Sequence, residues 1–226
     1  MTGEAPDWWR ERPRRITLYT DAGSWIAPWV DRLRAEIERG GDAAFVHHDY
    51  DEAEPSAAAF FLGCTRLAGP DVLARHRRNL VVHESALPKG RGFAPVAWQI
   101  IEGANEIPVR LIEAVDGPAD SGPIVLSDAL RFDGTELFDE IRRAQGEATI
   151  ALCLRFLQAP SPPEGAPQEG EPSYYPRRRP ADSELDPARS LAEQFDLLRT
   201  VDDRTHPAFF RYRGARYRLS IRREEE

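Results

Sequence analysis

Residues 79–92, NLVVHESALPKGRG, contain a hydrophobic run that ends abruptly in polar residues. Residues 80–82 (LVV) are apolar and mostly β-branched, which is typical of a buried strand. The polar triplet HES follows at once, and the proline and glycines after it indicate a loop. In open parallel sheets, ligands bind beyond the carboxyl ends of the strands. The stretch therefore predicts a core strand that carries His83 to a binding edge.

Further strands and helices alternate on the N-terminal side of this stretch. Residues 16–21 and 57–64 predict short strands. Residues 24–41 have the apolar spacing of a helix, with Ser24 as the expected N-cap and two glycines at the end. This alternation predicts βαβ units, and hence an α/β fold with a Rossmann-like, mostly parallel sheet. The phosphate-binding pattern GxGxxG is absent from the sequence.

The same pattern continues toward the C-terminus. Residues 109–116 and 123–132 predict two more strands around the loop GPADSG. A long amphipathic helix follows, and Thr135 is its expected cap. We therefore expect one α/β domain that spans residues 14–158.

A change of composition separates this domain from the rest of the chain. Residues 159–172 are acidic and rich in proline and glycine, which predicts a flexible surface linker. Residues 190–201 then predict an amphipathic helix, and residues 208–221 predict a β-hairpin with a glycine turn. We expect residues 173–223 to form a C-terminal helix-and-hairpin appendage.

The bulk properties exclude several classes of protein. A net charge of −8 over 226 residues argues against a nucleic-acid-binding protein, which needs a basic face. The chain has no run of roughly 18 to 20 apolar residues and no signal-peptide core, so we expect a cytoplasmic protein without a membrane partner. Cys64 and Cys153 are expected to be buried free thiols. Nothing has zinc-site spacing, so we expect no metal.

Two loops carry side chains that are suited to proton transfer. His83 ends one predicted strand, and Asp120 lies in the loop after another. A carboxylate held against an imidazole fixes its tautomer and favours acid or base catalysis near neutral pH. A histidine at a strand end is also a common structural residue, and PADSG is an ordinary turn composition. The residues alone leave both interpretations open.

The stretch HESALPKGRGFAPVAWQIIEG, followed later by DSGPIV, resembles the formyltransferase family. That family has a catalytic histidine before a Ser-Leu-Leu-Pro stretch, then Arg-Gly, a Trp-containing helix and an Asp-x-Gly-x-Ile strand. The resemblance covers the domain at 14–158 and implies that His83 and Asp120 are catalytic and that 10-formyltetrahydrofolate is the co-substrate. The folate-binding residues that it implies are Val115, Asp116, Gly117, Asp120 and Arg91.

The sequence departs from the family at one position. The family has an asparagine two residues before the histidine, and Val81 occupies that position here. Asn79 lies four residues before His83, about 13 Å away along an extended strand, so it does not substitute in place. Loss of an oxyanion-binding amide costs on the order of a hundredfold in rate. The departure leaves three alternatives: another donor such as Glu84 or Ser85, a slow enzyme, or a folate- and nucleotide-sugar-binding protein that is catalytically impaired.

The C-terminal segment suggests the acceptor. The stretch YYPRRRPADSELD and the helix and hairpin after it resemble amino-sugar N-formyltransferases, and most closely those of the pseudaminic-acid type. Those enzymes formylate a UDP-linked 4-amino-4,6-dideoxy sugar in surface glycan biosynthesis. The resemblance implies a nucleotide-sugar site in which a tyrosine stacks on the base and arginines bind the diphosphate. The expected residues are Lys89, Tyr174, Tyr175, Arg177 and Arg178.

Other acceptors and simpler interpretations stay open at this point. GDP- or dTDP-linked amino sugars fit the sequence as well, because nothing in it identifies the base. A solvated basic turn is the ordinary alternative for the arginines. A tRNA acceptor is not expected, because the C-terminal segment does not predict the barrel domain of methionyl-tRNA formyltransferases and the chain is acidic. The aromatic residues of the hairpin suggest a homodimer.

Overall fold

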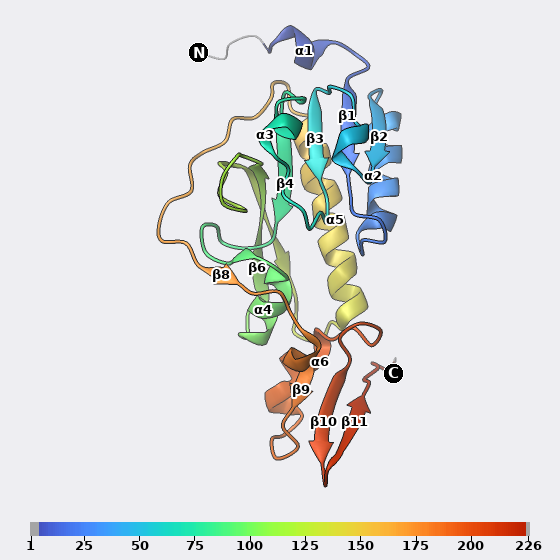
Figure 1. Cartoon of the computed structure of the whole chain (residues 1–226), viewed down its shortest axis with the longest axis vertical. Coiled ribbons are helices and arrows are strands. Elements are labelled where there is room, and N and C mark those ends of the chain that lie inside the picture. Colours follow the sequence, from blue (N-terminus) through green and yellow to red (C-terminus); the bar gives the residue numbers. More distant parts are fainter. Residues whose placement is uncertain (1–4, 225–226) are drawn as a thin grey trace.

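The computed structural model describes residues 5–224, which form an α/β domain with a C-terminal unit at one end of it (Figure 1). The central sheet has the strand order β2-β1-β3-β4-β6-β7. β1 to β4 are parallel, whereas β6 and β7 are antiparallel to their neighbours. The predicted mostly parallel sheet is therefore confirmed. Its strands are β1 (Arg15–Tyr19), β2 (Ala43–His47), β3 (Ala58–Phe61), β4 (Asn79–His83), β6 (Glu106–Glu113) and β7 (Ile124–Arg131).

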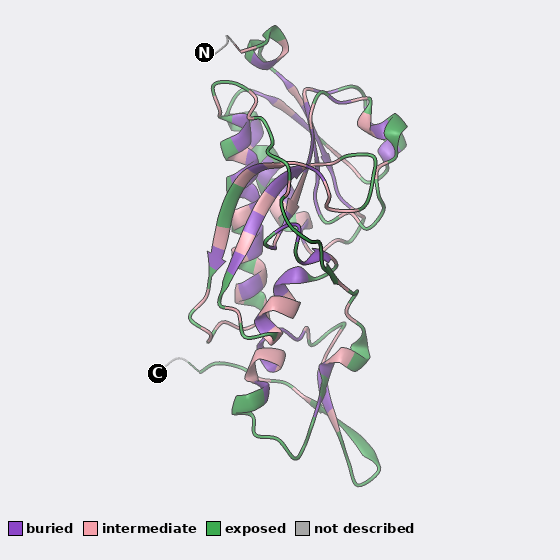
Figure 2. Ribbon diagram, turned by 90° about the vertical axis from the view of Figure 1, so that its left-hand side faces the viewer, coloured by how far each residue is buried: buried purple, intermediate pink, exposed green. Residues whose placement is uncertain are grey.

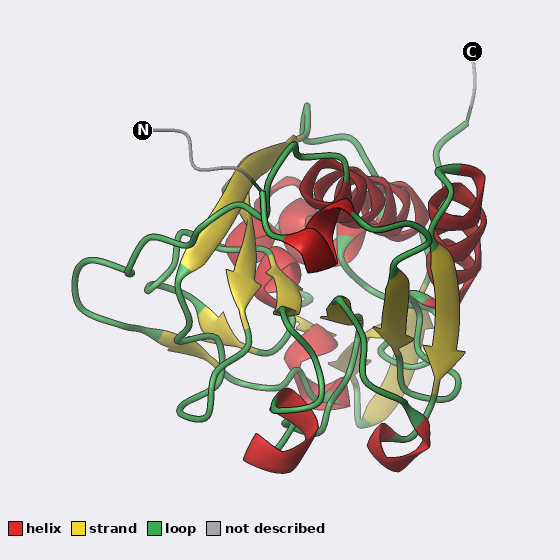
Figure 3. Ribbon diagram, turned by 90° about the horizontal axis from the view of Figure 1, so that it is seen from above, coloured by secondary structure: helices red, strands yellow, loops and turns green. Residues whose placement is uncertain are grey.

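The two long helices, α2 (Ala27–Arg39) and α5 (Phe138–Leu157), pack against each other and cover one face of the sheet (Figure 3). Both begin later than expected. The Ser24 hydroxyl donates to the carbonyl of Gly63 instead of capping α2, and the Thr135 hydroxyl donates to the Asp133 carboxylate instead of capping α5. The short helices are α1 (Asp7–Arg10), η1 (Tyr50–Glu52), α3 (Pro70–Leu73) and α4 (Pro95–Ile101). Among residues 5–224, no helix has the length and apolar character needed to cross a membrane.

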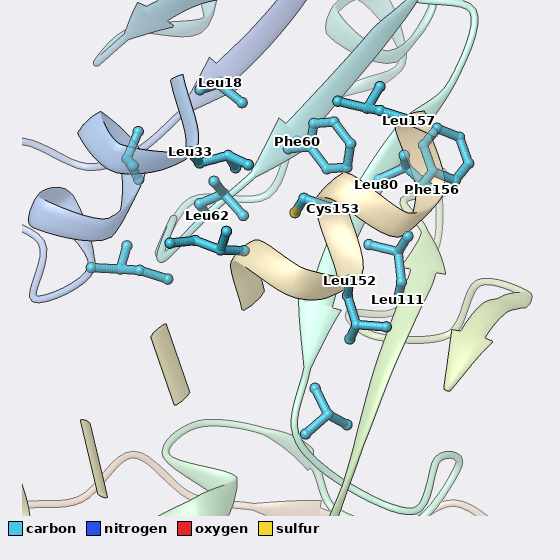
Figure 4. Packing of buried hydrophobic residues seen from close by; sticks show 14 of the residues in the cluster. Leu18, Leu33, Phe60, Leu62, Leu80, Leu111, Leu152, Cys153, Phe156 and Leu157 are labelled. Atoms are coloured by element: carbon cyan, nitrogen blue, oxygen red, sulfur yellow. The ribbon is translucent and has the colours of Figure 1, made fainter. Parts of the chain in front are cut away.

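The core lies between the sheet and these two helices (Figure 4). Leu18 of β1, Phe60 of β3 and Leu80 of β4 meet Cys153 and Phe156 of α5 there, and each is fully buried. All four residues of β3 are buried, so the opposite face of the sheet is covered as well. A smaller cluster covers it, comprising Tyr19, Tyr50, Ala53, Ala59, Phe61 and Val72. A strand buried on both faces explains the unbroken apolar runs in the sequence.

The C-terminal unit consists of a three-stranded sheet and short helical turns. The predicted hairpin forms from β10 (Ala208–Tyr212) and β11 (Ala215–Leu219), whose outer surface is exposed (Figure 2). The predicted helix at 190–201 is shorter than expected: only α6 (Phe195–Arg199) is α-helical. The remaining elements are η2 (Pro180–Ser183), β9 (Glu184–Leu185) and η3 (Ala192–Gln194). Tyr212 and Tyr217 are about half-exposed on the hairpin, and the homodimer stays a prediction.

Residues 159–172, the segment expected to be a flexible linker, contain no helix or strand but run back along the domain (Figure 1). Ala166 pairs with Ile124 at the start of β7 through two hydrogen bonds of 2.7 and 2.9 Å. The Arg78 guanidinium donates to the carbonyl of Pro163 at 2.6 Å. Directly after residues 159–172, β8 (Tyr174–Tyr175) pairs with β5 (Arg91–Gly92), which lies in the loop beyond β4. The segment is thus held on the domain at several points, which the linker composition did not indicate.

Candidate active site

The loops that follow β1, β3, β4 and β6 surround one cavity of about 730 Å³. His83, the last residue of β4, lies in its wall and is 5% exposed. Because β6 is antiparallel to β4, the loop between β6 and β7 begins beside Asn79 at the other end of β4, and it forms part of the wall by folding back toward His83. Five of the residues predicted from the sequence are thereby brought to one cavity: His83, Val115, Asp116, Gly117 and Asp120.

Both ring nitrogens of His83 face oxygen atoms. Nε2 lies 2.9 Å from the carbonyl oxygen of Gly90, and Nδ1 lies 3.5 Å from Oδ1 of Asp120. A carbonyl oxygen only accepts, so Nε2 carries a proton. The ring and the Asp120 carboxylate are therefore held next to each other in the cavity wall.

Asp120 is held in an uncommon backbone conformation. Its φ is +58°, in the left-handed region that residues other than glycine rarely adopt. The other carboxylate oxygen, Oδ2, accepts a hydrogen bond of 2.9 Å from the backbone N–H of Gly92. A strained residue of this kind persists only where its surroundings fix it, and such residues concentrate at functional sites. The carboxylate is thus oriented toward His83 by the loop beyond β4.

Arg91 and Lys89 lie outside the cavity wall. Arg91 is 9% exposed, and its Nη2 donates to Oε1 of Gln168 at 2.6 Å. Lys89 is exposed, and its side chain has no hydrogen bond or ion pair with the rest of residues 5–224. Arg91 therefore supports the wall from behind, whereas the role expected for Lys89 stays a prediction. Sequence reasoning missed Gln168, because its segment has the composition of a linker.

The two tyrosines predicted to bind substrate differ in their contacts with the rest of the protein. Tyr175 stacks on Trp98, with ring centroids 6.5 Å apart, and its hydroxyl donates to Oε2 of Glu102 at 2.6 Å. Burial and then the Glu102 carboxylate raise the pKa of Tyr175 to about 12. Tyr174 is 58% exposed and presents most of its ring to solvent. Of the pair, Tyr174 is the one available to stack on a base.

The two arginines also separate. The Arg177 guanidinium lies 4.4 Å from the ring centre of Phe93, which lines the cavity. Arg178 points into the C-terminal unit and donates to Thr200 and to the Ser183 hydroxyl, each at 3.2 Å. Burial lowers the pKa of Arg178. Arg177 therefore lies near the cavity mouth, whereas the Arg178 guanidinium is used in hydrogen bonds within the C-terminal unit.

The position of the missing asparagine is an apolar part of the cavity wall. Val81 lines the cavity, and the Asn79 amide points elsewhere and donates to the carbonyl of Leu73 at 2.9 Å. Glu84 lines the cavity as well, and its carboxylate accepts from Gln145 at 3.2 Å. The Ser85 hydroxyl is buried and has no hydrogen-bond partner among the described residues. Asn79 is thus excluded as a replacement donor.

Comparisons with known proteins agree with this geometry. Residues 16–155 match the protein family described as Formyl transferase. Several solved structures are similar over most of the chain, including the following three. A methionyl-tRNA formyltransferase from Clostridium thermocellum is 23% identical with a TM-score of 0.76, and the match covers 93% of this chain and 93% of that one. HypX from Aquifex aeolicus, in complex with tetrahydrofolic acid, is 17% identical with a TM-score of 0.73 over 92% of this chain and 38% of HypX.

The third is a sugar N-formyltransferase from Shewanella, which is 11% identical with a TM-score of 0.64 over 94% of this chain and 98% of that one. Identities this low establish a shared fold and leave the acceptor open. The family match, in contrast, spans more than half of the chain and includes both His83 and Asp120. The chain therefore belongs to the formyl transferase family and is a folate-dependent formyltransferase.

Proposed function

We propose that the chain transfers the formyl group of 10-formyltetrahydrofolate to the amine of a nucleotide-linked 4-amino-4,6-dideoxy sugar, with UDP as the expected nucleotide. The observation that carries the proposal is the His83–Asp120 pair in the wall of a cavity of about 730 Å³. The similarity to the Shewanella sugar N-formyltransferase supports this class of acceptor. The resemblance of residues 174–186 to pseudaminic-acid-type enzymes supports UDP.

The cavity has the size and the lining that a folate needs. Volumes of 300 to about 1,000 Å³ are typical of small-molecule sites, and these sites combine apolar walls with a few polar groups. Phe61, Val81 and Ile112 supply the apolar surface here. The loop that contains Val115, Asp116 and Gly117 supplies main-chain polar groups and is the expected folate contact. When bound, 10-formyltetrahydrofolate supplies the activated formyl group.

His83 and Asp120 account for the proton transfers that the reaction needs. The neutral sugar amine forms a bond to the formyl carbon, and the carbonyl electron pair moves onto the formyl oxygen. His83, as the imidazolium, stabilises the negative charge on that oxygen. Asp120 holds the ring in place and balances its charge. The bond from the formyl carbon to N10 of the folate then breaks as N10 takes up the proton of the imidazolium and the carbonyl re-forms. The amine gives its proton to the neutral ring, which restores the imidazolium.

The acceptor is expected at the mouth of the cavity, beside β5 and β8. Arg177 contacts Phe93 there, and Tyr174 of β8 is exposed. A guanidinium suits a diphosphate because it offers two parallel donors, and a tyrosine ring suits a nucleotide base. Arg178 and Tyr175 are bound to other parts of the chain, so the proposal rests on Tyr174 and Arg177.

A substrate panel tests the proposal directly. The protein is mixed with 10-formyltetrahydrofolate and with UDP-, dTDP- or GDP-linked 4-amino-4,6-dideoxy sugars or with methionyl-tRNA, and folate absorbance is followed. We expect turnover with the UDP-sugar and none with tRNA. Turnover with tRNA alone would overturn the proposed acceptor. Tight binding of folate and sugar without turnover would instead indicate a catalytically impaired binding protein.

His83→Ala tests the catalytic assignment. The variant removes the proposed cation, so we expect turnover to be abolished while circular dichroism shows an intact fold. The matched control is His206→Ala in the C-terminal unit, which should turn over normally. Near-normal turnover of His83→Ala would show that His83 is not a catalytic residue.

A further inference from the structure

The side chain of Gln168 is fully occupied by three partners around the catalytic loop. Its Nε2 donates to the carbonyl of Asp120 at 2.7 Å and to the carbonyl of Gly122 at 2.8 Å. Its Oε1 accepts from Nη2 of Arg91 at 2.6 Å. An amide has two donors and one carbonyl oxygen, so the orientation of the group is determined by its partners. The two carbonyls are those of Asp120 itself and of the residue two positions later.

These bonds close a ring around Asp120. Gly92 holds the Asp120 carboxylate from one side, and Gln168 holds the Asp120 backbone from the other. Arg91 precedes Gly92 in the chain and binds Gln168, so it connects the two sides. Because Asp120 has a φ of +58°, it depends on such contacts to keep its conformation.

The surrounding segment places Gln168 in register with this loop. Ala166, two residues earlier, forms the antiparallel bridge to Ile124. Gly165 approaches Pro123 so closely that a Cβ atom added there would lie 2.6 Å from the proline ring. Gly122 packs against the carbonyl of Glu113 in β6 in the same way. The loop after β6 is thus enclosed between β6 and residues 165–168.

We propose that Gln168 is a positioning residue for formyl transfer, which holds Asp120 in the conformation that presents its carboxylate to His83. The inference rests on the roles of His83 and Asp120 in the proposed function. It also assigns a role to residues 159–172: they fasten the catalytic loop from outside the cavity. Through Arg91, which pairs with Tyr174 in the β5–β8 bridge, the ring also adjoins the expected acceptor site.

Gln168→Glu is the sharpest test. This variant keeps the length of the side chain and an acceptor for Arg91, but an oxygen now faces the two carbonyls in place of the donors. We expect kcat to fall by about ten- to a hundredfold, as for other residues that orient a reacting group. The KM for 10-formyltetrahydrofolate should change by less than about twofold, because Gln168 does not line the cavity. The pH profile of kcat should move relative to the wild type.

The neighbouring Glu169→Ala is the matched control. Glu169 is exposed on the same segment, and its side chain has no hydrogen bond or ion pair within the described part of the chain. It should leave kcat and the pH profile unchanged. All variants are compared at a temperature at which thermal unfolding shows each of them to be folded, so a loss of kcat does not reflect unfolding.

A double-mutant cycle separates positioning from general stabilisation. If Gln168 acts through Asp120, then Gln168→Ala should cost nothing further in the Asp120→Asn background. A full additive loss in that background would overturn the inference. The inference would also be overturned if Gln168→Glu retained both the kcat and the pH profile of the wild type.

A measurement without an acceptor distinguishes this inference from the proposed function. In ¹⁵N spectra of the His83 ring at one fixed pH, Gln168→Ala should change the chemical shifts of the ring nitrogens, and Glu169→Ala should not. If His83→Ala and Asp120→Asn both retain turnover, the proposed function fails. If those two variants lose most of their turnover and the Gln168 variants behave as the wild type in kinetics and in the spectra, only the role of Gln168 is overturned.

Discussion

At the scale of single residues, the main question is what stabilises the negative charge that develops during formyl transfer. The wall at position 81 is a valine, and Asn79 donates to the carbonyl of Leu73, away from the cavity. His83 has the Gly90 carbonyl and the Asp120 carboxylate opposite its two nitrogens, and the proposed mechanism uses the ring as a cation. A cation stabilises an oxyanion more strongly than a neutral amide does. The charge on His83 is therefore our candidate to compensate for the missing asparagine.

A second buried histidine makes stability depend on pH. His76 is 6% exposed, and its ring nitrogens lie 3.1 Å from the Tyr19 hydroxyl and 2.7 Å from the Ser56 hydroxyl. Burial, and then the charge of Arg75, lowers the pKa of His76 to about 4. An unfolded histidine has a pKa of about 6.5. Between these values the unfolded chain binds a proton that the folded chain does not, so stability falls as the pH falls.

The expected loss between pH 6.5 and pH 4 is at most about 3 kcal/mol, since each pKa unit corresponds to about 1.4 kcal/mol. Urea unfolding at pH 7 and at pH 4.5 measures it. His76→Gln cannot titrate, so the free energy of unfolding should depend less on pH in this variant than in the wild type. His206→Gln in the C-terminal unit is the control. Equal pH dependence in the wild type and in His76→Gln would contradict the prediction.

The site residues were predictable only where a strand delivers them. His83 ends an apolar run, so the sequence indicated that it would reach the carboxyl edge of the sheet. Asp120 lies in the loop after β6, which leaves the sheet beside Asn79 at the other end of β4, and it meets His83 because that loop folds back. Arg177 and Arg178 show the limit of this reasoning. They are adjacent in a basic turn, and only the fold determines that one guanidinium contacts Phe93 and the other binds Thr200. Gln168 had no signal, because a single glutamine in a proline-rich segment is ordinary in composition.

At the scale of elements, the strands were predictable but their directions were not. The apolar patterns at 109–116 and 123–132 correspond to β6 and β7. A parallel pair needs a crossover connection, and the ten residues between these strands form only a loop. The short loop thus made an antiparallel pair predictable, and β6 and β7 are antiparallel. The direction of β6 relative to β4 had no such indication, because α4 lies between them and a helix serves either arrangement.

The packing of α2 on α5 depends on one glycine. A Cβ atom added at Gly146 in the middle of α5 would lie 2.2 Å from Nε1 of Trp29 in α2. Gly146→Ala gains about 1 kcal/mol of helix propensity. The overpacking against the rigid indole costs more, so we expect a net destabilisation of about 1 to 2 kcal/mol in urea unfolding.

Trp29→Leu reveals whether this clash is the cause. In that background the indole is absent, so Gly146→Ala should become stabilising by its helix propensity alone. Arg143→Ala, at an exposed position of α5, is the control and should be nearly neutral. A stabilising Gly146→Ala in the wild-type background would show that the helices separate freely and would contradict the packing described here.

At the scale of the whole molecule, a buried arginine joins the C-terminal unit to the catalytic domain. Arg199 of α6 is fully buried. Its Nη2 donates to Oδ1 of Asn105 at 2.6 Å, and its Nη1 lies 3.7 Å from the Glu136 carboxylate, just before α5. Its Nε donates to Asp196 within α6 at 2.7 Å. One side chain thus connects α6 to two loops of the catalytic domain.

Arg199→Met should loosen the unit without unfolding the domain. Methionine fills a similar volume but provides none of these donors, and loss of charged hydrogen bonds costs about 2 kcal/mol. Amide hydrogen exchange should become faster in β9, β10 and β11 and stay unchanged in β1, β3 and β4. Arg218→Ala, on the exposed face of β11, is the control and should leave exchange in both parts unchanged. If exchange in Arg199→Met increases equally in both parts, the two unfold together and Arg199 is not a separable connection between them.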